Sequence, residues 1–361
     1  MIETLIILIF ILGYGAIALE AKTGVNKSAA ALLTAALCWV LFAFKAGAGG
    51  LGQFGPIFEA AAQVVFFLIG AMTIVQLMDA HNGFQVIADM LRTKDKRALL
   101  WVMALATFFL SSILDNLTTA IVMVSLFHRL IHDKEDRLIF GGVVIIAANA
   151  GGSWSPIGDV TTTMLWIGGQ VSTFGIMHKL FVPSLIALLV PLVWFSCAMK
   201  KEDLAVSAGP VAPLPAGAKR VFFLGLGALI FVPIFKMLTG LPPVLGMLFG
   251  VGVMWAVTDR LHGEKKEHLK VHKVLAKVDF SSALFFLGIL LAVGVLDASG
   301  ILRALSIWMD GALGSKDLIA TVIGLASAVV DNVPLTAATM GMYNLAQHPM
   351  DSKLWELLAY A

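Results

Sequence analysis

The sequence predicts an all-α polytopic membrane protein, built from inverted repeats that carry re-entrant hairpins and discontinuous helices. Three observations support this prediction. Hydrophobic residues make up 59% of the 361 residues and charged residues 13%, with a mean hydropathy of +0.92, which is too apolar for one water-soluble globule. Many apolar runs are long enough to cross a bilayer as helices, which satisfy their own backbone in lipid. One polar motif also occurs twice.

Seven apolar runs are predicted to span the membrane without interruption: residues 1–20, 28–44, 60–78, 180–199, 219–239, 242–258 and 280–297. Two further runs are interrupted. Residues 98–130 are broken at Asp115-Asn116, and residues 138–168 are broken at residues 151–159, whose sequence is GGSWSPIGD. Glycine and proline sustain a helix poorly, and unwound backbone is tolerated in a membrane only where it lines a cavity or is buried in protein. We expect the function to lie at these breaks.

Basic loops predict the orientation of the chain. Lys and Arg gather in residues 92–97, 200–220 and 260–277, and the positive-inside rule places all three loops in the cytoplasm. Only an even number of crossings fits between the first two loops. Residues 98–130 are therefore predicted to turn back as a re-entrant hairpin with Asp115-Asn116 at its tip.

The second half of the chain repeats the first. Asp331-Asn332 follows Asp115-Asn116 by 216 residues, Phe-Phe-Leu at 66–68 recurs at 285–287, and Asp297 corresponds to Asp79. The first copy starts outside and the second inside, so the repeats are predicted to be inverted, as in secondary transporters. Because Ala361 aligns with Ile145, we expect the partner of the 151–159 break to lie beyond residue 361, which leaves the second repeat incomplete.

These features predict five parts. They are scaffold spans at 1–59, a first repeat at 60–199 (tip 115–116, broken helix 149–163), a cytoplasmic linker at 200–218, scaffold spans with a basic loop at 219–279, and a second repeat at 280–361 (tip 331–332). The net charge of +2 is small, and its positive residues lie in loops, which indicates membrane orientation and not nucleic-acid binding.

Three aspartates are the main candidates for chemistry: Asp115, Asp159 and Asp331. An ionised aspartate at mid-membrane depth costs at least about 2.5 kcal/mol, so it should face a cavity or a partner. Alternatively, Asp115 and Asp331 cap the half-helices that follow them, a role compatible with binding a ligand. Further oxygen donors suited to an alkali cation lie nearby: Asn116, Thr118, Thr119, Asn149, Ser153, Ser155, Thr161, Thr162 and Asn332. The hydroxyls of Thr161 to Thr163 could instead bond back within their helix.

Three motifs resemble those of the NhaD-type sodium/proton antiporters, in the ion transporter superfamily that also holds arsenite and dicarboxylate carriers. They are LDNLTT at 114–119, ANAGGSWSPIGDVTTTMLW at 148–166 and VDNVPL at 330–335. The resemblance covers nearly the whole chain. It implies export of Na⁺ or Li⁺ in exchange for protons by alternating access, a transport domain beside a scaffold, and a homodimer formed through that scaffold. We expect no cofactor beyond the transported ions, lipid and small cations as partners, and the cell inner (plasma) membrane as the location.

A carboxylate that binds either Na⁺ or a proton, but never both, exchanges the two if the loaded site alternates sides. We expect Na⁺ at Asp115, Asn116, Asn149 and Asp159, with Asp331 and Asn332 completing the site. Burial and a neighbouring carboxylate both raise the pKa of an aspartate, which brings its protonation toward physiological pH.

Two alternatives stay open at this point. Hairpin tips in the wider superfamily usually carry Ser-Asn-Thr-like residues, and an anion or arsenite carrier of that superfamily is the first alternative, although two carboxylates repel an anion. The second is an intramembrane aspartyl protease, in which two aspartates share a proton, although its Gly-x-Gly-Asp signature differs from the PIGD of residues 156–159. His81, His128 and His132 are interpreted as surface groups, and Asp79 and Asp297 as groups that solvate the ends of their spans.

Overall fold

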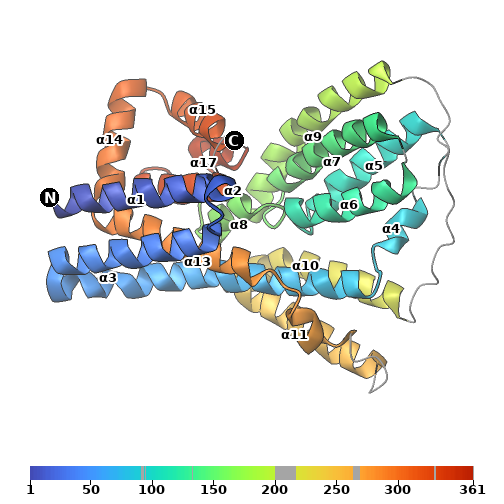
Figure 1. Ribbon diagram of the computed structural model, residues 1–361, viewed down its shortest axis with the longest axis horizontal. Coiled ribbons are helices and arrows are strands. Elements are labelled where there is room, and N and C mark those ends of the chain that lie inside the picture. Colours follow the sequence, from blue (N-terminus) through green and yellow to red (C-terminus); the bar gives the residue numbers. More distant parts are fainter. Residues whose placement is uncertain are drawn as a thin grey trace. The chain divides into compact units, whose positions relative to one another are not determined.

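The computed structural model describes residues 1–90, 93, 95–131, 133–199, 217–262, 269–328 and 331–360. Every regular element in these ranges is a helix, in agreement with the predicted all-α class (Figure 1). In chain order they are α1 (Ile2–Ala18), α2 (Glu20–Thr23), α3 (Lys27–Ala80), α4 (Gln85–Met90), α5 (Lys96–Ser111), α6 (Asn116–Leu130), α7 (Lys134–Ser153), α8 (Val160–Ile167), α9 (Thr173–Ala198), α10 (Ala218–Thr239), α11 (Pro243–His262), α12 (Val271–Leu275), α13 (Phe280–Ala298), α14 (Ile301–Leu313), α15 (Lys316–Ser327), α16 (Asn332–Met342) and α17 (Lys353–Tyr360).

Within the described ranges, six helical stretches are long and apolar enough to cross a membrane: Lys27–Gly47, Gly52–Ala80, Thr173–Ala198, Ala218–Thr239, Pro243–Leu261 and Phe280–Ala298. The chain is therefore a multi-pass membrane protein. These stretches match six of the seven predicted spans, and the seventh is the shorter apolar helix α1. The first two are the halves of α3, which bends at Gly47, where the backbone φ is 57°. The second half begins at Gly52 and not at residue 60, because Phe54, Ile57 and Phe58 prolong the apolar run.

The chain forms two compact units, which we describe separately. Unit 1 comprises Met1–Ile69, Met164–Ser172 and Asp279–Ala361, and unit 2 comprises Gly70–Thr163 and Thr173–Val278. The predicted division into scaffold and repeats follows sequence similarity and not compactness, and it stays a prediction.

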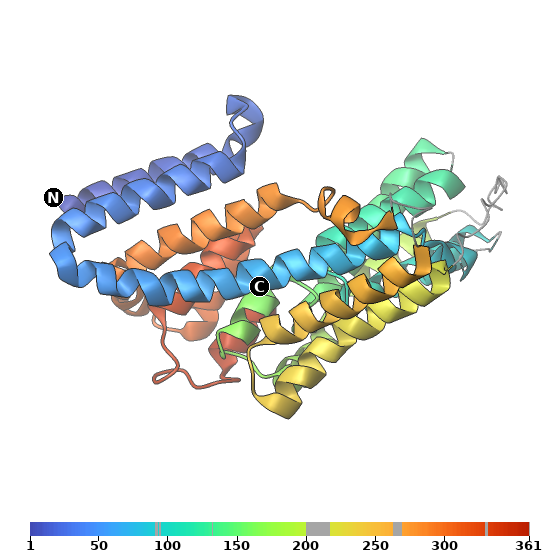
Figure 2. The ribbon, with the colours of Figure 1, turned by 90° about the horizontal axis from the view of Figure 1, so that it is seen from below.

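In unit 2, α5, α6, α7 and α9 pack together as a bundle, which runs from cyan to green in Figure 1. The side chain of Asp95 caps α5 by accepting hydrogen bonds from the backbone N–H groups of Arg97 and Ala98. An ion pair between Lys96 and Asp136 then ties α5 to α7. Helices α10 and α11 form a separate hairpin, the yellow pair in Figure 2. The bundle is the part of unit 2 that carries the interrupted helices.

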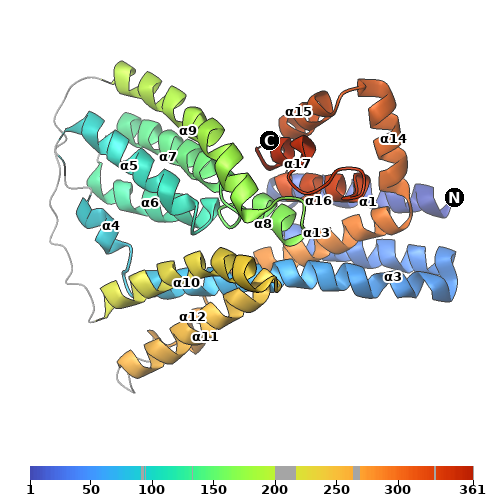
Figure 3. The same ribbon diagram turned by 180° about the vertical axis from the view of Figure 1, so that it is seen from behind.

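In unit 1, α13 and α14 pack against α16, and α15 contacts α16 and α17 (Figure 3). The first half of α3 lies against α13, because the indole N–H of Trp39 donates to the carbonyl of Leu291 at 3.1 Å. Gly288 makes this approach possible, since a Cβ there would lie 2.8 Å from the backbone of Ala31. Unit 1 therefore combines helices from both ends of the chain.

One interpretation from the sequence is wrong. His81 is not a surface group but is fully buried, with its Nδ1 atom 2.7 Å from the carbonyl oxygen of Leu77. His81 stands at the start of a turn that ends α3, in which Asn82 has a φ of 53° and the N–H of Gly83 donates back to the carbonyl of Met78, so the chain does not continue outward as a helix at this point. His128 is exposed as expected.

Several predictions fall on residues outside the described ranges. These are His132, most of the linker at 200–218 and much of the three basic loops, including Arg92, Lys94, Lys200, Lys201 and residues 263–268. The cytoplasmic placement of those loops stays a prediction.

Candidate ion-binding site

The first Asp-Asn motif, the predicted hairpin tip, lies between α5 and α6 in unit 2. As predicted, the helix is broken here: α5 ends at Ser111 and α6 begins at Asn116. The Oδ1 atom of Asp115 accepts a hydrogen bond from the backbone N–H of Thr118 at 2.9 Å, so its predicted capping role is confirmed. The backbone of Asp115 has φ 108° and ψ 154°, a conformation that is almost confined to glycine and costs about 1–3 kcal/mol. Such strain tends to occur at functional sites.

The second interruption lies between α7 and α8, and it is shorter than predicted. Helix α7 continues through Gly151 and Gly152 to Ser153, and α8 begins at Val160. The two glycines do not break the helix; they allow close approach. A Cβ on Gly151 would collide with the backbone of Phe108 on α5, and one on Gly152 would lie 2.5 Å from the carbonyl oxygen of Gly158.

Contacts between the tip and the break bring two of the three candidate aspartates together. The hydroxyl of Ser111 donates to the carbonyl of Ala148 at 2.5 Å, and a Cβ on Gly158 would lie 2.9 Å from the Ser111 carbonyl oxygen. The carboxyl groups of Asp115 and Asp159 consequently lie close enough to interact electrostatically. Both stand at the start of a helix, where the positive end of the helix dipole offsets part of their charge.

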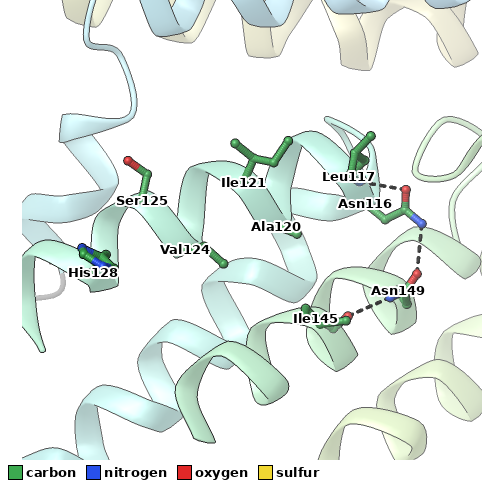
Figure 4. Close-up of a pocket in the computed structure, with 9 residues that line it drawn as sticks. All are labelled: Asn116, Leu117, Ala120, Ile121, Val124, Ser125, His128, Ile145 and Asn149. Atoms are coloured by element: carbon green, nitrogen blue, oxygen red, sulfur yellow. Dashed lines mark hydrogen bonds between the residues drawn. The ribbon is translucent and has the colours of Figure 1, made fainter. Parts of the chain in front are cut away.

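Two asparagines link the same elements (Figure 4). The amide nitrogen of Asn116 donates to the Oδ1 atom of Asn149 at 3.1 Å. The amide nitrogen of Asn149 donates to the carbonyl of Ile145 at 2.9 Å, and the Oδ1 atom of Asn116 accepts from the N–H of Leu117 at 2.8 Å. Each side-chain oxygen can still accept one more bond or contact a cation.

The three threonines that follow the break form hydrogen bonds with different partners. The N–H of Thr161 donates to the Oδ1 atom of Asp159 at 3.4 Å. The hydroxyl of Thr162 donates to the carbonyl of Asp159 at 2.9 Å, and that of Thr163 donates to the carbonyl of Pro156 at 3.0 Å. Back-bonding at the start of the helix therefore holds for Thr162, whereas Thr163 bonds to the break that precedes α8. Their lone pairs stay available to a ligand.

The serines of the break hold its shape. The hydroxyl of Ser153 lies 2.8 Å from that of Ser184 on α9, and the hydroxyl of buried Ser155 accepts from the N–H of Ile157 at 3.3 Å. Trp154 stacks on Phe108 with ring centroids 6.0 Å apart. The sequence did not single out Ser184, although a serine inside an otherwise apolar span is a signal that could have identified it.

Thr119 is the one site hydroxyl that is buried without a hydrogen-bond partner in the described chain. An unsatisfied buried hydroxyl costs about 1–3 kcal/mol, and its oxygen offers lone pairs to a cation. It lies one turn into α6, immediately after the tip.

The second Asp-Asn motif, also a predicted hairpin tip, lies in unit 1, where α16 begins at Asn332 with Asp331 as its N-cap. The Oδ1 atom of Asp331 accepts from the N–H of Val333 at 3.1 Å, so this cap is also confirmed. The hydroxyl of Tyr14 donates to the carbonyl of Asp331 at 3.3 Å. Sequence reasoning missed Tyr14, because nothing local links a residue of α1 to a tip 317 residues away.

A cavity of about 660 Å³ opens beside the first tip, along one face of α6 (Figure 4). Its lining includes Asn116 and Asn149 near the tip and His128 one helix length away. The side chains between them are mostly apolar: Leu117, Ala120, Ile121, Val124, Ser125 and Ile145. The cavity connects the polar tip with the far end of α6.

Known proteins resemble this chain over nearly its whole length. It matches the family described as a citrate transporter over residues 6–361. It is 49% identical over 361 residues to sodium/proton antiporter 1 of Arabidopsis thaliana, covering 98% of this chain and 62% of that protein. It is 47% identical to sodium/proton antiporter 2 of the same plant, covering 98% and 86%, and 28% identical to the Na⁺/H⁺ antiporter NhaD of Vibrio cholerae, covering 93% and 77%.

All these descriptions are of transporters, and none is of an enzyme. It spans less than two thirds of the length of the first of these relatives. The chain carries the long 148–166 motif between two Asp-Asn motifs, and it resembles proteins named sodium/proton antiporters over nearly its full length. It therefore belongs to the NhaD-type sodium/proton antiporter family.

Proposed function

We propose that the protein exchanges sodium ions for protons across its membrane. The observation that carries the proposal is the packing of the tip that holds Asp115 against the break that holds Asp159 in unit 2, in a chain 47% identical to a plant protein named sodium/proton antiporter 2. Carboxylate, amide and hydroxyl oxygens are ligands suited to a hard cation such as Na⁺.

The binding step follows from the local geometry. Asp115 and Asp159 supply the charge, the amide oxygens of Asn116 and Asn149 supply neutral ligands, and the unpaired hydroxyl of Thr119 supplies a further one. The capping N–H groups keep each carboxylate in place. A proton on either carboxyl removes the charge that holds the cation, so the site carries one or the other.

Several finer features belong to the same proposal. The protein exports sodium while protons enter the cell, and it accepts lithium in place of sodium. The loaded site is open in turn to the two sides of the membrane. The 16 residues of α5 extend about 24 Å and the 15 residues of α6 about 22 Å. Both lengths are less than the roughly 30 Å of hydrocarbon, which supports a re-entrant hairpin. The proposal also includes the inverted arrangement of the repeats and the inner-membrane location. It further includes contributions to ion binding from Ser153, Ser155, Thr118, Thr161 and Thr162.

A homodimer formed through the scaffold is also part of the proposal. It is tested by the mass of the detergent-solubilised protein, measured by light scattering with the detergent contribution subtracted. A mass of one chain at the concentrations used for transport would overturn it.

Citrate transport is a second candidate, favoured by one observation, the matching family description. Citrate is an anion, and two adjacent carboxylates repel it unless a cation lies between them. Sodium/proton exchange therefore suits the residues present better.

The test uses the purified full chain in proteoliposomes that contain a pH-sensitive dye. The interior of the proteoliposomes is made acidic, and salt is added outside. We expect external NaCl or LiCl to drive protons out of the interior, and external KCl or choline chloride to leave the interior pH unchanged. Uptake of labelled citrate, with no sodium-driven proton movement, would support the second candidate and overturn the first.

A further inference from the structure

Unit 1 contains a cavity of about 370 Å³ that the proposed exchange site does not use. Four elements line it, namely the second half of α3, α8 with the turn after it, α13 and α16. At about 30 Å³ for each water molecule, it holds roughly a dozen waters. Its lining is apolar except for Gln63, Gln170 and Asp297.

Asp297 is the only lining residue that carries a charge. In the part of the chain that the structure describes, its carboxylate has neither an ion pair nor a side-chain hydrogen bond. It lies in the last turn of α13, and Gly341, in the last turn of α16, faces it. Helix C-termini carry partial negative charge, so both helices add to the field of the carboxylate. A cation is the partner that this field attracts.

The cavity corresponds to the one beside the first tip. Both run along the helix that follows an Asp-Asn tip, α6 in unit 2 and α16 in unit 1. Three pairs of lining residues stand at equivalent positions in the repeat, 216 residues apart: Ile121 and Ala337, Val124 and Met340, and Ser125 and Gly341. The same face of each tip helix therefore borders a cavity.

The predicted topology assigns each cavity, taken by itself, to a side of the membrane. The cavity on α6 runs from the tip to His128, toward loops predicted to be cytoplasmic. In the cavity of unit 1, Ile57, Gln170 and Asp297 all lie where their segments are predicted to reach the outer surface. Four elements that meet at their predicted outer ends form an opening on that side.

We propose that the cavity of unit 1 is the outward-facing vestibule of the transporter, and that Asp297 attracts the sodium ion into it along α16, the helix that follows Asp331. Asp297 raises the local cation concentration and guides the ion, as a charged cleft does. Its removal should change the sodium dependence of exchange more than its maximal rate. The proposal rests on the sodium/proton exchange proposed above.

The first test measures exchange by Asp297→Asn in proteoliposomes over a range of sodium concentrations. We expect the sodium concentration for half-maximal exchange to rise about tenfold at low ionic strength, with a nearly unchanged maximal rate and recovery in Asp297→Glu. Asp79→Asn is the matched control, because Asp79 occupies the equivalent position but lines neither described cavity. Half-saturation equal to that of the parent protein would overturn the proposal.

A second test does not depend on transport. In a background with Cys38→Ala and Cys197→Ser, the substitution Met340→Cys places a single cysteine in the lining of the cavity. We expect a cationic thiol reagent to react about tenfold faster than an anionic reagent of equal size, and the ratio to approach one in Asp297→Asn. A ratio that is the same with and without Asp297 refutes the vestibule. If the parent protein moves no protons with sodium but this ratio depends on Asp297, the proposed exchange has failed and the attraction of cations stands.

Discussion

The two Asp-Asn tips have the same residues but hold their aspartates differently. Asp115 has a φ of 108° and Asp331 a φ of −54°. The residue three positions after the aspartate accounts for the difference in capping. Thr118 offers its backbone N–H to Asp115, whereas Pro334 has no N–H, so Asp331 is bound by Val333 instead. A sequence repeat therefore predicts where a tip lies but not the backbone conformation of its aspartate.

The surroundings of the tips differ as well. The first tip packs on the break between α7 and α8, where Gly158 brings backbone against Ser111. The second tip is contacted by the hydroxyl of Tyr14. Strain, a second carboxylate and an unpaired hydroxyl occur together at the first tip, which identifies it as the more specialised of the two.

The largest effect should come from neutralising the first tip. Asp115→Asn and Asp159→Asn each remove charge from the paired carboxylates, and we expect a loss of sodium-driven proton flux of about 100-fold or more. Asp331→Asn, measured in the same proteoliposomes, should lose about tenfold. Equal losses at both tips would show that the difference in backbone conformation has no functional meaning.

Packing between the first tip and the break should produce the next largest effect. A Cβ on Gly158 would lie 2.7 Å from the Gly152 carbonyl oxygen and 2.9 Å from that of Ser111, so Gly158→Ala should destabilise unit 2 by about 3 kcal/mol. Thermal unfolding in detergent measures the loss. Gly142→Ala is the control, because Gly142 lies on α7 with open space around it; a similar fall in both variants would contradict this packing.

The sequence predicted the positions of both tips and of the α7–α8 break, because polar residues inside apolar runs mark them directly. It could not predict that Gly151 and Gly152 remain helical, since their role depends on Phe108 from another helix. The burial of His81 and the contact of Tyr14 with Asp331 also depend on distant parts of the chain. The local sequence pattern therefore shows where a helix is interrupted, whereas contacts with distant residues determine the backbone conformation at the interruption.

Backbone strain at the first tip predicts a smaller, position-specific effect. Glycine adopts the conformation of Asp115 without penalty, whereas alanine does not. Asp115→Gly should therefore be more stable than Asp115→Ala by about 2 kcal/mol. At Asp331, where φ is −54°, the same pair should differ by only the modest preference of an N-cap for glycine. Thermal unfolding of the four variants measures the difference in stability between the glycine and the alanine variant at each position. Equal differences at Asp115 and Asp331 would remove the evidence for strain at Asp115.

The smallest effect should follow from removing the contact at the second tip. Tyr14→Phe deletes a hydroxyl that donates over 3.3 Å to the Asp331 carbonyl, and a neutral bond of this length contributes no more than about 1 kcal/mol. The hydrogen bond is made to the backbone carbonyl of Asp331, so its loss leaves the Asp331 carboxylate unchanged. We therefore expect a fall of a few degrees or less in the unfolding temperature and a sodium dependence within about twofold of the parent protein. A loss of exchange as large as that of Asp331→Asn would mean that Tyr14 positions the second tip, and that this tip also depends on its neighbours for its active conformation.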